Sequence, residues 1–379
     1  MNGKFLIDLY LIFLTAMLPA NLVLPQINNW MLGPFQKADS VNPILSPDVK
    51  TKFFCPIRKE EISWEAKDVF NPAAAIKDGK IYLLYRAEDS IGKPAGTSRI
   101  GLAWSEDGYH FNKYSEPVLY PENDFMKKYE WEGGCEDPRV VEDDNGNFIM
   151  TYTSFDGKLA RLSIAASKDL IHWKKHGLAF AKAYNGKYIN VWSKSGAIVC
   201  KLKNGKFAAE KIGGKYWMFW GDNNIYLASS TNLIDWKPVE FEGDTVNNNL
   251  PAYASAMKKL KPVFTPRTGK FDSRLVESGP PAILTDAGIL LIYNGANKND
   301  KSLPRGTYSG GQILIDKSNL FHILKRSDSN FIKPDKSYEI SGQVNNVCFL
   351  EGLVYFKDAW FLYYGTADSK IAAAVFHPD

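Results

Sequence analysis

The sequence has few cysteines and histidines. Its 379 residues include four Cys, at positions 55, 135, 200 and 348, with no Cys-x-x-Cys pair. That number is too small for a disulfide framework, although an exported chain has room for one bridge, and the spacing does not predict a structural zinc site. The five His are scattered without the spacing of metal ligands. We therefore expect no metal and no organic cofactor.

The sequence also lacks an excess of charge of either sign. Its 46 basic and 42 acidic residues are spread along the chain and give a net charge of +4. Because no concentrated basic tract is present, we expect no nucleic-acid partner. A hydrophobic content of 45% is enough for a substantial core. Aromatic residues make up 13% of the chain, and such rings stack on sugars as well as filling sheet cores.

Long apolar runs are missing except near the N-terminus, where Leu9 to Leu18 follows Lys4. With Ala20 as the cleavage position, residues 1–24 are predicted to be an export signal. The run is too short for a membrane span, so we expect none in the mature chain and a periplasmic or cell-surface location. The alternative is a buried N-terminal element.

A weak internal repeat indicates the fold. The segments Ser105–Phe111, Ser167–Trp173 and Ser230–Trp236 end in aromatic residues that are 62 and 63 positions apart. Each follows short apolar strands, and no long helical pattern competes with them, so the chain is predicted to be all-β. A period of this length favours a β-propeller, formed by residues 25–379 as one domain. Further apolar strands at 289–315 and 354–375 add two blades, which makes five. A sandwich with long loops is the structural alternative.

Two less regular parts of the chain accompany this repeat. Residues 25–60, rich in Pro and Asn, are predicted to form an N-terminal arm that closes the ring. Residues 240–270 are longer and more polar than a blade turn requires, so we expect an excursion over one face. Polar residues that interrupt the inner strands would meet at one end of the axis, where a shared pocket is expected.

The segment Trp131–Arg139, WEGGCEDPR, is the best candidate for a functional site. Gly133 and Gly134 permit backbone angles, or a close approach of a ligand, that a side chain would forbid. Pro138 is expected to hold Asp137 in an extended conformation. Arg139 can pair with one carboxylate and leave another free to act as an acid. The alternative is an Asp-Pro turn with a surface salt bridge.

Together with this segment, several others resemble glycoside hydrolase family 130, the mannoside phosphorylases and β-mannosidases built on five-bladed propellers. The resemblance spans nearly the whole predicted mature chain. It rests on Asn71-Pro72-Ala73, Tyr85-Arg86-Ala87, Ser98-Arg99-Ile100-Gly101, GGCEDPR, Glu210-Lys211-Ile212, Gly214-Lys215-Tyr216, Gly279-Pro280-Pro281 and Tyr364-Gly365-Thr366-Ala367-Asp368.

The resemblance implies that Asp137 is the general acid and that its proton can travel through a mannose hydroxyl. We expect burial beside Glu136 to raise the pKa of Asp137 toward neutrality. For two of the implied sugar-binding arginines, Arg86 and Arg99, a structural ion pair is the alternative, and for Asp368 it is a turn cap. The sugar-binding residues implied are Asn71, Arg86, Arg99, Glu136, Arg139, Asn294 and Asp368.

Departures from the family pattern favour hydrolysis over phosphorolysis. Where the resemblance predicts His-Arg-Pro, the chain has Trp220-Gly221-Asp222, and where it predicts His, the chain has Asn294. Glu277 adds a carboxylate that would repel phosphate. A hydrolase needs a general base, for which Glu277 and Glu210 are the candidates, Glu277 being favoured.

The resulting prediction is an inverting, exo-acting β-mannosidase that cleaves β-1,2-linked mannosides, so the expected partner is a β-mannoside oligosaccharide. The linkage comes from the resemblance alone, and the oligomeric state stays open. One alternative is a mannoside phosphorylase whose phosphate site uses Lys194, Lys211 or Lys215. Another is a non-catalytic carbohydrate-binding propeller.

Overall fold

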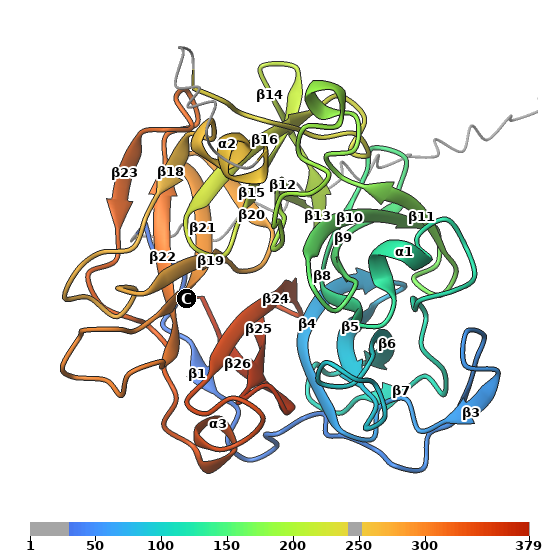
Figure 1. The fold of residues 1–379 in the computed structure, drawn as a ribbon. Coiled ribbons are helices and arrows are strands. Elements are labelled where there is room, and N and C mark those ends of the chain that lie inside the picture. The colour runs from blue at the N-terminus through green and yellow to red at the C-terminus, as the bar shows by residue number, and fades with distance from the viewer. Residues whose placement is uncertain (1–29, 242–251, 379) are drawn as a thin grey trace, which may run out of the picture.

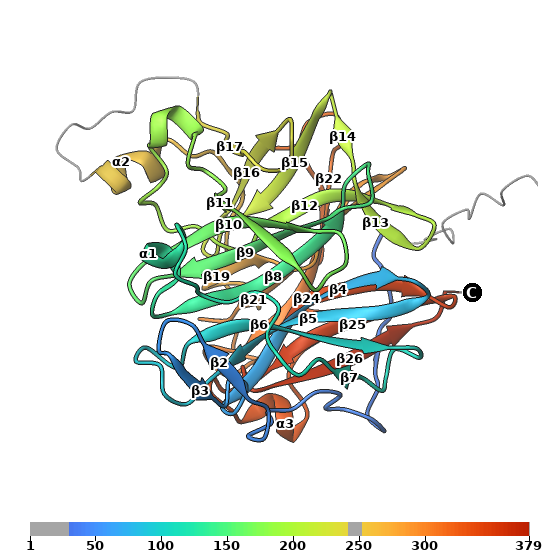
Figure 2. The same cartoon turned by 90° about the vertical axis from the view of Figure 1, so that its right-hand side faces the viewer.

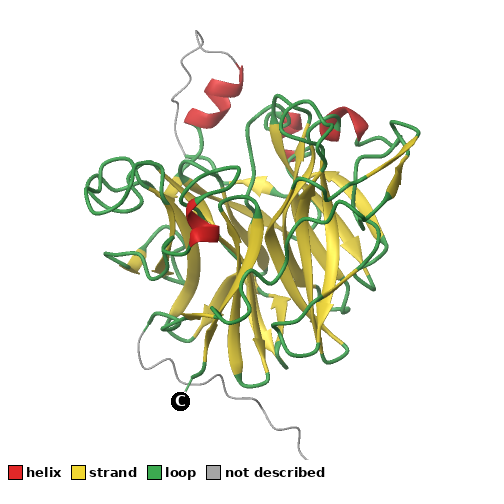
Figure 3. Ribbon diagram, turned by 90° about the horizontal axis from the view of Figure 1, so that it is seen from below, coloured by secondary structure: helices red, strands yellow, loops and turns green. Residues whose placement is uncertain are grey.

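The computed structural model describes residues 30–241 and 252–378, and the predicted signal at 1–24 lies outside them (Figure 1). Strands dominate the described chain, and the helices are short and peripheral (Figure 3). The all-β prediction is therefore confirmed. None of the helices described is long and apolar enough to cross a membrane. The helical elements are α1 (Lys127–Glu130), η1 (Ala183–Gly186), α2 (Ala252–Lys258) and α3 (Ser337–Ile340).

The strands form successive antiparallel meanders, in which most strands pair with the next strand along the chain. The first contains β4 (Asp68–Lys77), β5 (Lys80–Glu88), β6 (Ser98–Ser105) and β7 (Asn112–Lys113). The second contains β8 (Gly134–Glu142), β9 (Phe148–Phe155), β10 (Ala160–Ser167) and β11 (Trp173–Leu178). A separate hairpin pairs β2 (Phe53–Cys55) with β3 (Glu60–Ile62).

The later meanders are less regular. The third contains β12 (Ala197–Lys203), β13 (Lys206–Ala209), β14 (Lys211–Ile212), β15 (Lys215–Trp220), β16 (Ile225–Ser230), β17 (Lys237–Pro238) and β18 (Pro262–Phe264). The fourth contains β19 (Leu275–Ser278), β20 (Ala282–Thr285), β21 (Gly288–Ala296), β22 (Tyr308–Ile315) and β23 (Ile323–Arg326). The last contains β24 (Cys348–Phe356), β25 (Ala359–Thr366), β26 (Lys370–Phe376) and β1 (Gln36–Lys37). The blade count of five and a closed ring stay predictions.

The sheets pack face to face, and Figure 2 shows several of them lying one above another. Alternate residues of a strand point to opposite faces, so each sheet supplies two cores. In β5, Leu83 and Tyr85 pack in one cluster with Phe361, whereas Leu84 packs in another with Val140. Strands covered on both faces are apolar throughout, which explains their long buried runs.

The sequence repeat corresponds to a repeated turn. Ser105 Oγ accepts hydrogen bonds from the backbone N–H groups of Asp107 (3.2 Å) and Gly108 (2.8 Å). Ser167 and Ser230 accept the equivalent bonds in the two other turns. A serine hydroxyl bonded to its own turn stabilises the chain reversal, which explains why the same residue type recurs.

The two ends of the described chain meet in the last meander. Strand β1 pairs with β26 through Gln36 and Val375. Nearby, the fully buried Gln312 side chain accepts a bond from Leu32 N–H (2.8 Å) and donates one to Leu32 O (2.7 Å). The predicted N-terminal arm is thus held by both sheet pairing and a buried amide.

Replacement of Gln312 by Ala should leave the buried Leu32 N–H and C=O without partners. We expect this variant to lose about 2 kcal/mol of unfolding free energy, measured by urea denaturation. Gln36→Ala, at an exposed position of β1, is the control and should change the value by less than about 0.5 kcal/mol. Equal effects of the two substitutions would contradict this account of the arm.

Candidate active site

One pocket collects polar residues from different meanders. It has a volume of about 280 Å³ and is lined by Asn71 of β4, Arg86 of β5, Asp137 of β8 and Glu277 of β19, together with Asp368 from the turn after β25. All five were predicted site residues. They are far apart in sequence, and the ends of adjoining strands bring them together.

Asp137 occupies a bulge in β8. The pairing with β9 shifts register between Glu136 and Arg139, and Asp137 has φ of 47°. The prediction that Pro138 holds Asp137 in an extended conformation is therefore wrong, because the bulge places it in the left-handed region.

Two further pocket residues share the left-handed backbone of Asp137. Asn71, also followed by a proline, has φ of 48° at a bulge in β4, and Asp368 has φ of 49°. Non-glycine residues seldom adopt this conformation, and such outliers concentrate at functional sites. The recurrence at three positions of one pocket supports a functional role for it.

The glycines of WEGGCEDPR allow an unusual backbone angle, as predicted, and also close packing against neighbouring segments. Gly134 has φ of 117°, and a Cβ there would collide with the backbone of Ser98, to which it pairs in parallel. A Cβ on Gly133 would collide with Phe155. These contacts fix the segment that carries Asp137 against β6 and β9.

The buried Asp137 carboxylate is surrounded by donors and cations. Its Oδ1 accepts a bond from Asn71 Nδ2 (2.9 Å) and lies 3.3 Å from Arg86. Its Oδ2 lies 3.1 Å from Lys194 Nζ. Burial works against ionisation, but Lys194, Arg86 and Asn71 prevail and hold the pKa of Asp137 well below its usual range. The expected raised pKa of Asp137 is thus wrong for the free site.

Two neighbouring carboxyl groups show the opposite shift. Burial raises the pKa of Glu136, and the nearby Asp137 charge adds to the rise, although Arg86 lies 2.9 Å away and opposes it. Burial likewise raises the pKa of Asp368 to about 7. The site therefore contains one strongly ionised carboxylate beside groups that keep a proton closer to neutral pH.

Glu277 lines the same pocket as Asp137. Its buried carboxylate accepts a hydrogen bond from the Ser195 hydroxyl and lies 3.2 Å from Lys194 Nζ. Burial raises the pKa of Glu277, and the Asp222 charge adds to the rise, while Lys194 opposes it. One ammonium group therefore bridges the two carboxylates predicted to be acid and base.

Arg139 ties together the strands that carry those carboxylates. Its buried guanidinium donates to Gly279 O and Ser278 O, both at 2.7 Å, and to Asp137 O at 3.3 Å. It also lies 3.5 Å from Glu351, a fully buried residue. Arg139 does not line the pocket, so we assign it a positioning role rather than the predicted sugar contact.

Four other predicted residues lie outside the pocket lining. Glu136 pairs with Arg86 of the lining at 2.9 Å. Arg99 is buried in an ion pair with Asp89 (2.8 Å), the structural alternative considered above. The Asn294 amide bonds both backbone groups of Leu350, at 2.7 and 3.0 Å, and the residue is fully buried, away from the pocket. Glu210 pairs with Lys203 at 2.7 Å.

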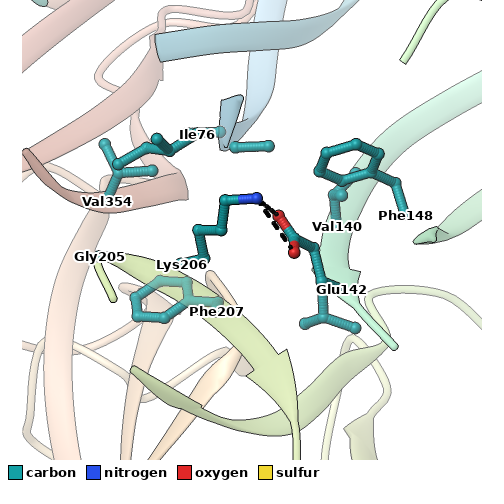
Figure 4. Close-up of a pocket in the computed structure, with 11 residues that line it drawn as sticks. Ile76, Val140, Glu142, Phe148, Gly205, Lys206, Phe207 and Val354 are labelled. Atoms are coloured by element: carbon teal, nitrogen blue, oxygen red, sulfur yellow. Dashed lines mark hydrogen bonds and ion pairs between the residues drawn. The ribbon is translucent and has the colours of Figure 1, made fainter. Parts of the chain in front are cut away.

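Strand position explains why Glu210 is remote. It follows β13, which pairs with β8 at Glu142, the opposite end of the strand from Asp137. At that end a cavity of only about 10 Å³ is crossed by the ion pair of Lys206 and Glu142 (3.0 Å), as Figure 4 shows. This space is too small for a sugar. Neither Glu210 nor this end of the sheets can serve the chemistry of the first pocket.

The sequence alone gave too little weight to Lys194 and missed Arg274, Tyr308 and several apolar residues of the pocket wall. Lys194 precedes β12 in an irregular segment with no motif around it. Arg274 directly precedes β19 and Tyr308 begins β22, so the two residues are far apart in sequence and come together only in the folded chain. The described residues hold no cluster of three His, Cys, Asp or Glu suited to a metal, and all four cysteines are free.

Comparison with known proteins agrees with the resemblance in the sequence. A family model described as beta-1,4-mannooligosaccharide phosphorylase, Glyco_hydro_130, matches residues 36–378. The chain belongs to glycoside hydrolase family 130. The family predicted from the sequence is thereby confirmed.

Relatives of this family-130 chain include proteins named as phosphorylases and proteins named as glycosyl hydrolases. It is 30% identical over 325 residues to the 1,2-beta-oligomannan phosphorylase of Thermoanaerobacter sp. strain X514, covering 84% of this chain and 92% of the relative. It is 45% identical to a solved glycosyl hydrolase from Bacteroides ovatus, with a TM-score of 0.86 over 92% of this chain and 95% of that one.

A further solved structure is also 45% identical, with a TM-score of 0.86 over 94% of this chain and 96% of that chain. It is described as showing that this family of mannoside phosphorylases contains glycoside hydrolases that target beta-1,2 mannosidic linkages in Candida mannan.

The raised pKa of Asp368 predicts a pH-dependent effect of Asp368→Asn. Between about pH 4 and 7 the folded wild type keeps a proton that the unfolded chain has lost, so this group lowers wild-type stability as pH rises. The neutral variant lacks this loss. Relative to wild type, its unfolding free energy should rise with pH by at most about 1.4 kcal/mol per unit and level off above about 7.

Urea denaturation at several pH values tests this expectation. Asp328→Asn is the matched control, because the Asp328 side chain is 87% exposed, and its difference from wild type should not vary in this range. A pH-independent difference for Asp368→Asn would contradict the assigned proton.

Proposed function

We propose that this chain is an exported, inverting, exo-acting β-mannosidase that hydrolyses β-1,2-linked mannosides on a five-bladed propeller. The observation that carries this proposal is the pair of buried carboxylates, Asp137 and Glu277, joined by Lys194 in one pocket. Two carboxyl groups flanking a sugar-sized space are what glycoside hydrolysis needs. Family membership supplies the mannoside substrate class.

In this proposal Asp137 donates a proton to the leaving-group oxygen, and Glu277 takes a proton from the attacking water. Asp137 is ionised in the free site, so it must gain a proton before bond cleavage. Glu136, its neighbour, keeps a proton to higher pH. When a bound mannoside displaces Lys194, Asp137 loses the cation that lowers its pKa most. Asp137 can then take up the proton of Glu136.

The charge balance of the pocket favours water over phosphate as the attacking group. Arg86 already faces Glu88 at 2.7 Å as well as Glu136 and Asp137. Lys194 is shared between two carboxylates. A phosphate entering beside Glu277 would meet a negative charge, and the inner cations would have to leave existing partners to bind it.

A mannoside phosphorylase is the second candidate function. Curated relatives bear that name, and Arg274 lines the pocket with no carboxylate within 4.0 Å among the residues that the structure describes. An arginine without a partner could hold a phosphate. The two functions differ in whether turnover needs phosphate.

Purified protein given β-1,2-mannobiose should release free mannose at a rate that does not depend on inorganic phosphate. Chromatography of the sugars with and without phosphate provides the measurement. Mannose 1-phosphate formed only when phosphate is present would establish the phosphorylase instead.

Substitution of Glu277 by Gln should lower kcat by roughly 10²- to 10⁴-fold with little change in KM, because the amide cannot accept the proton of water. Glu210→Gln, remote from the pocket, is the matched control and should stay within about twofold of wild type. Circular dichroism confirms folding of both variants. Near-normal turnover by Glu277→Gln would remove it from the base role.

A further inference from the structure

Trp192 is a partly exposed tryptophan beside the pocket. Its side chain is 42% exposed, whereas Trp64, Trp220 and Trp360 are almost fully buried. Its indole N–H donates to Asp222 Oδ2 at 2.8 Å, and its ring meets Phe155 edge-on with centroids 6.5 Å apart. The ring is thus held from two sides while part of its surface remains open to solvent.

The backbone places Trp192 next to the catalytic carboxylates. It lies in the irregular segment before β12, two residues from Lys194, which extends into the pocket. Gly221 N–H donates to Lys194 O at 3.0 Å, which joins this segment to the loop of Asp222.

The residues that contact Trp192 on its two sides lie close to the segments that carry Asp137 and Glu277. On one side, Phe155 packs against Gly133 in the segment that carries Asp137. On the other, Asn223, next to Asp222, accepts a bond from Val276 N–H at 3.3 Å, one residue before Glu277. Trp192 therefore stands at the rim of the pocket, between the segments that hold the two carboxylates.

We propose that Trp192 is the stacking platform for the sugar ring on the leaving-group side of the scissile bond. This inference rests on the proposed function. The charged groups inside the pocket can bind the hydroxyls of one mannose ring, and Trp192 does not line that inner space. A second ring attached to the first would extend to the rim, where an indole face offers the apolar surface that sugar C–H groups prefer.

The hydrogen bond to Asp222 gives this platform a fixed orientation. A rotating indole would lose conformational entropy when a sugar binds, whereas an anchored one has already lost it. Stacking on the leaving-group ring strengthens binding of substrates with at least two sugars. It contributes nothing to a mannoside whose leaving group is a single atom.

The test compares β-1,2-mannobiose with β-mannosyl fluoride, which lacks a second ring. Trp192→Ala should raise KM for mannobiose about tenfold, in line with the loss of an aromatic contact, and leave kcat/KM for the fluoride within about twofold of wild type. Trp192→Phe, which keeps a ring but not the N–H, should give an intermediate KM. Phe54→Ala removes a 61% exposed ring from β2 and is the matched control.

Three outcomes would overturn the platform. These are an unchanged KM for mannobiose, an equal loss with both substrates, and an effect of Phe54→Ala as large as that of Trp192→Ala. The proposed function fails separately, if the wild type cleaves mannobiose only with phosphate. In that case KM for mannobiose is measured in the presence of phosphate for the wild type, Trp192→Ala and the control Phe54→Ala. This comparison still decides the role of Trp192.

Discussion

The arrangement of the site depends on the Arg139 guanidinium. Its donors bind the carbonyl group of Ser278, the last residue of the strand of Glu277, and those of Gly279 and Asp137. A buried planar cation with several fixed donors sets both spacing and direction between the groups it joins. The separation of the segments that carry Asp137 and Glu277 is therefore set by one side chain that does not line the pocket.

A second constraint is the balance of charge around Lys194. Asp137 and Glu277 are both buried, and two such carboxylates would repel each other strongly without a cation between them. The pKa shifts show which carboxyl groups carry the negative charge. Asp137 stays ionised beside Lys194 and Arg86, whereas the pKa values of Glu136 and Asp368 rise. The left-handed backbone at Asn71, Asp137 and Asp368 adds a local conformational free-energy cost, which the packing of the surrounding sheets must offset.

Sequence patterns predicted the strands well because apolar periodicity and repeated turns are local properties. The Ser105, Ser167 and Ser230 turns are visible in the sequence for this reason. Asp137 and Glu277 were also identified, since each stands in or near a recognisable motif. Lys194 was considered only as a phosphate ligand, and Trp192 was not identified, because their contacts are with distant segments. Glu210 has a motif around it but belongs to the opposite end of its sheet, which only the strand pairing reveals.

The pairing of β1 with β26 has a consequence for how the protein matures. The last sheet joins residues from both ends of the described chain, and Asp368 lies in the turn between β25 and β26. A polypeptide still emerging from the ribosome can build its earlier meanders, but it lacks the strand that completes this sheet. One wall of the pocket therefore forms only after β25 and β26 have been synthesised, later than the walls that β4, β5 and β8 supply.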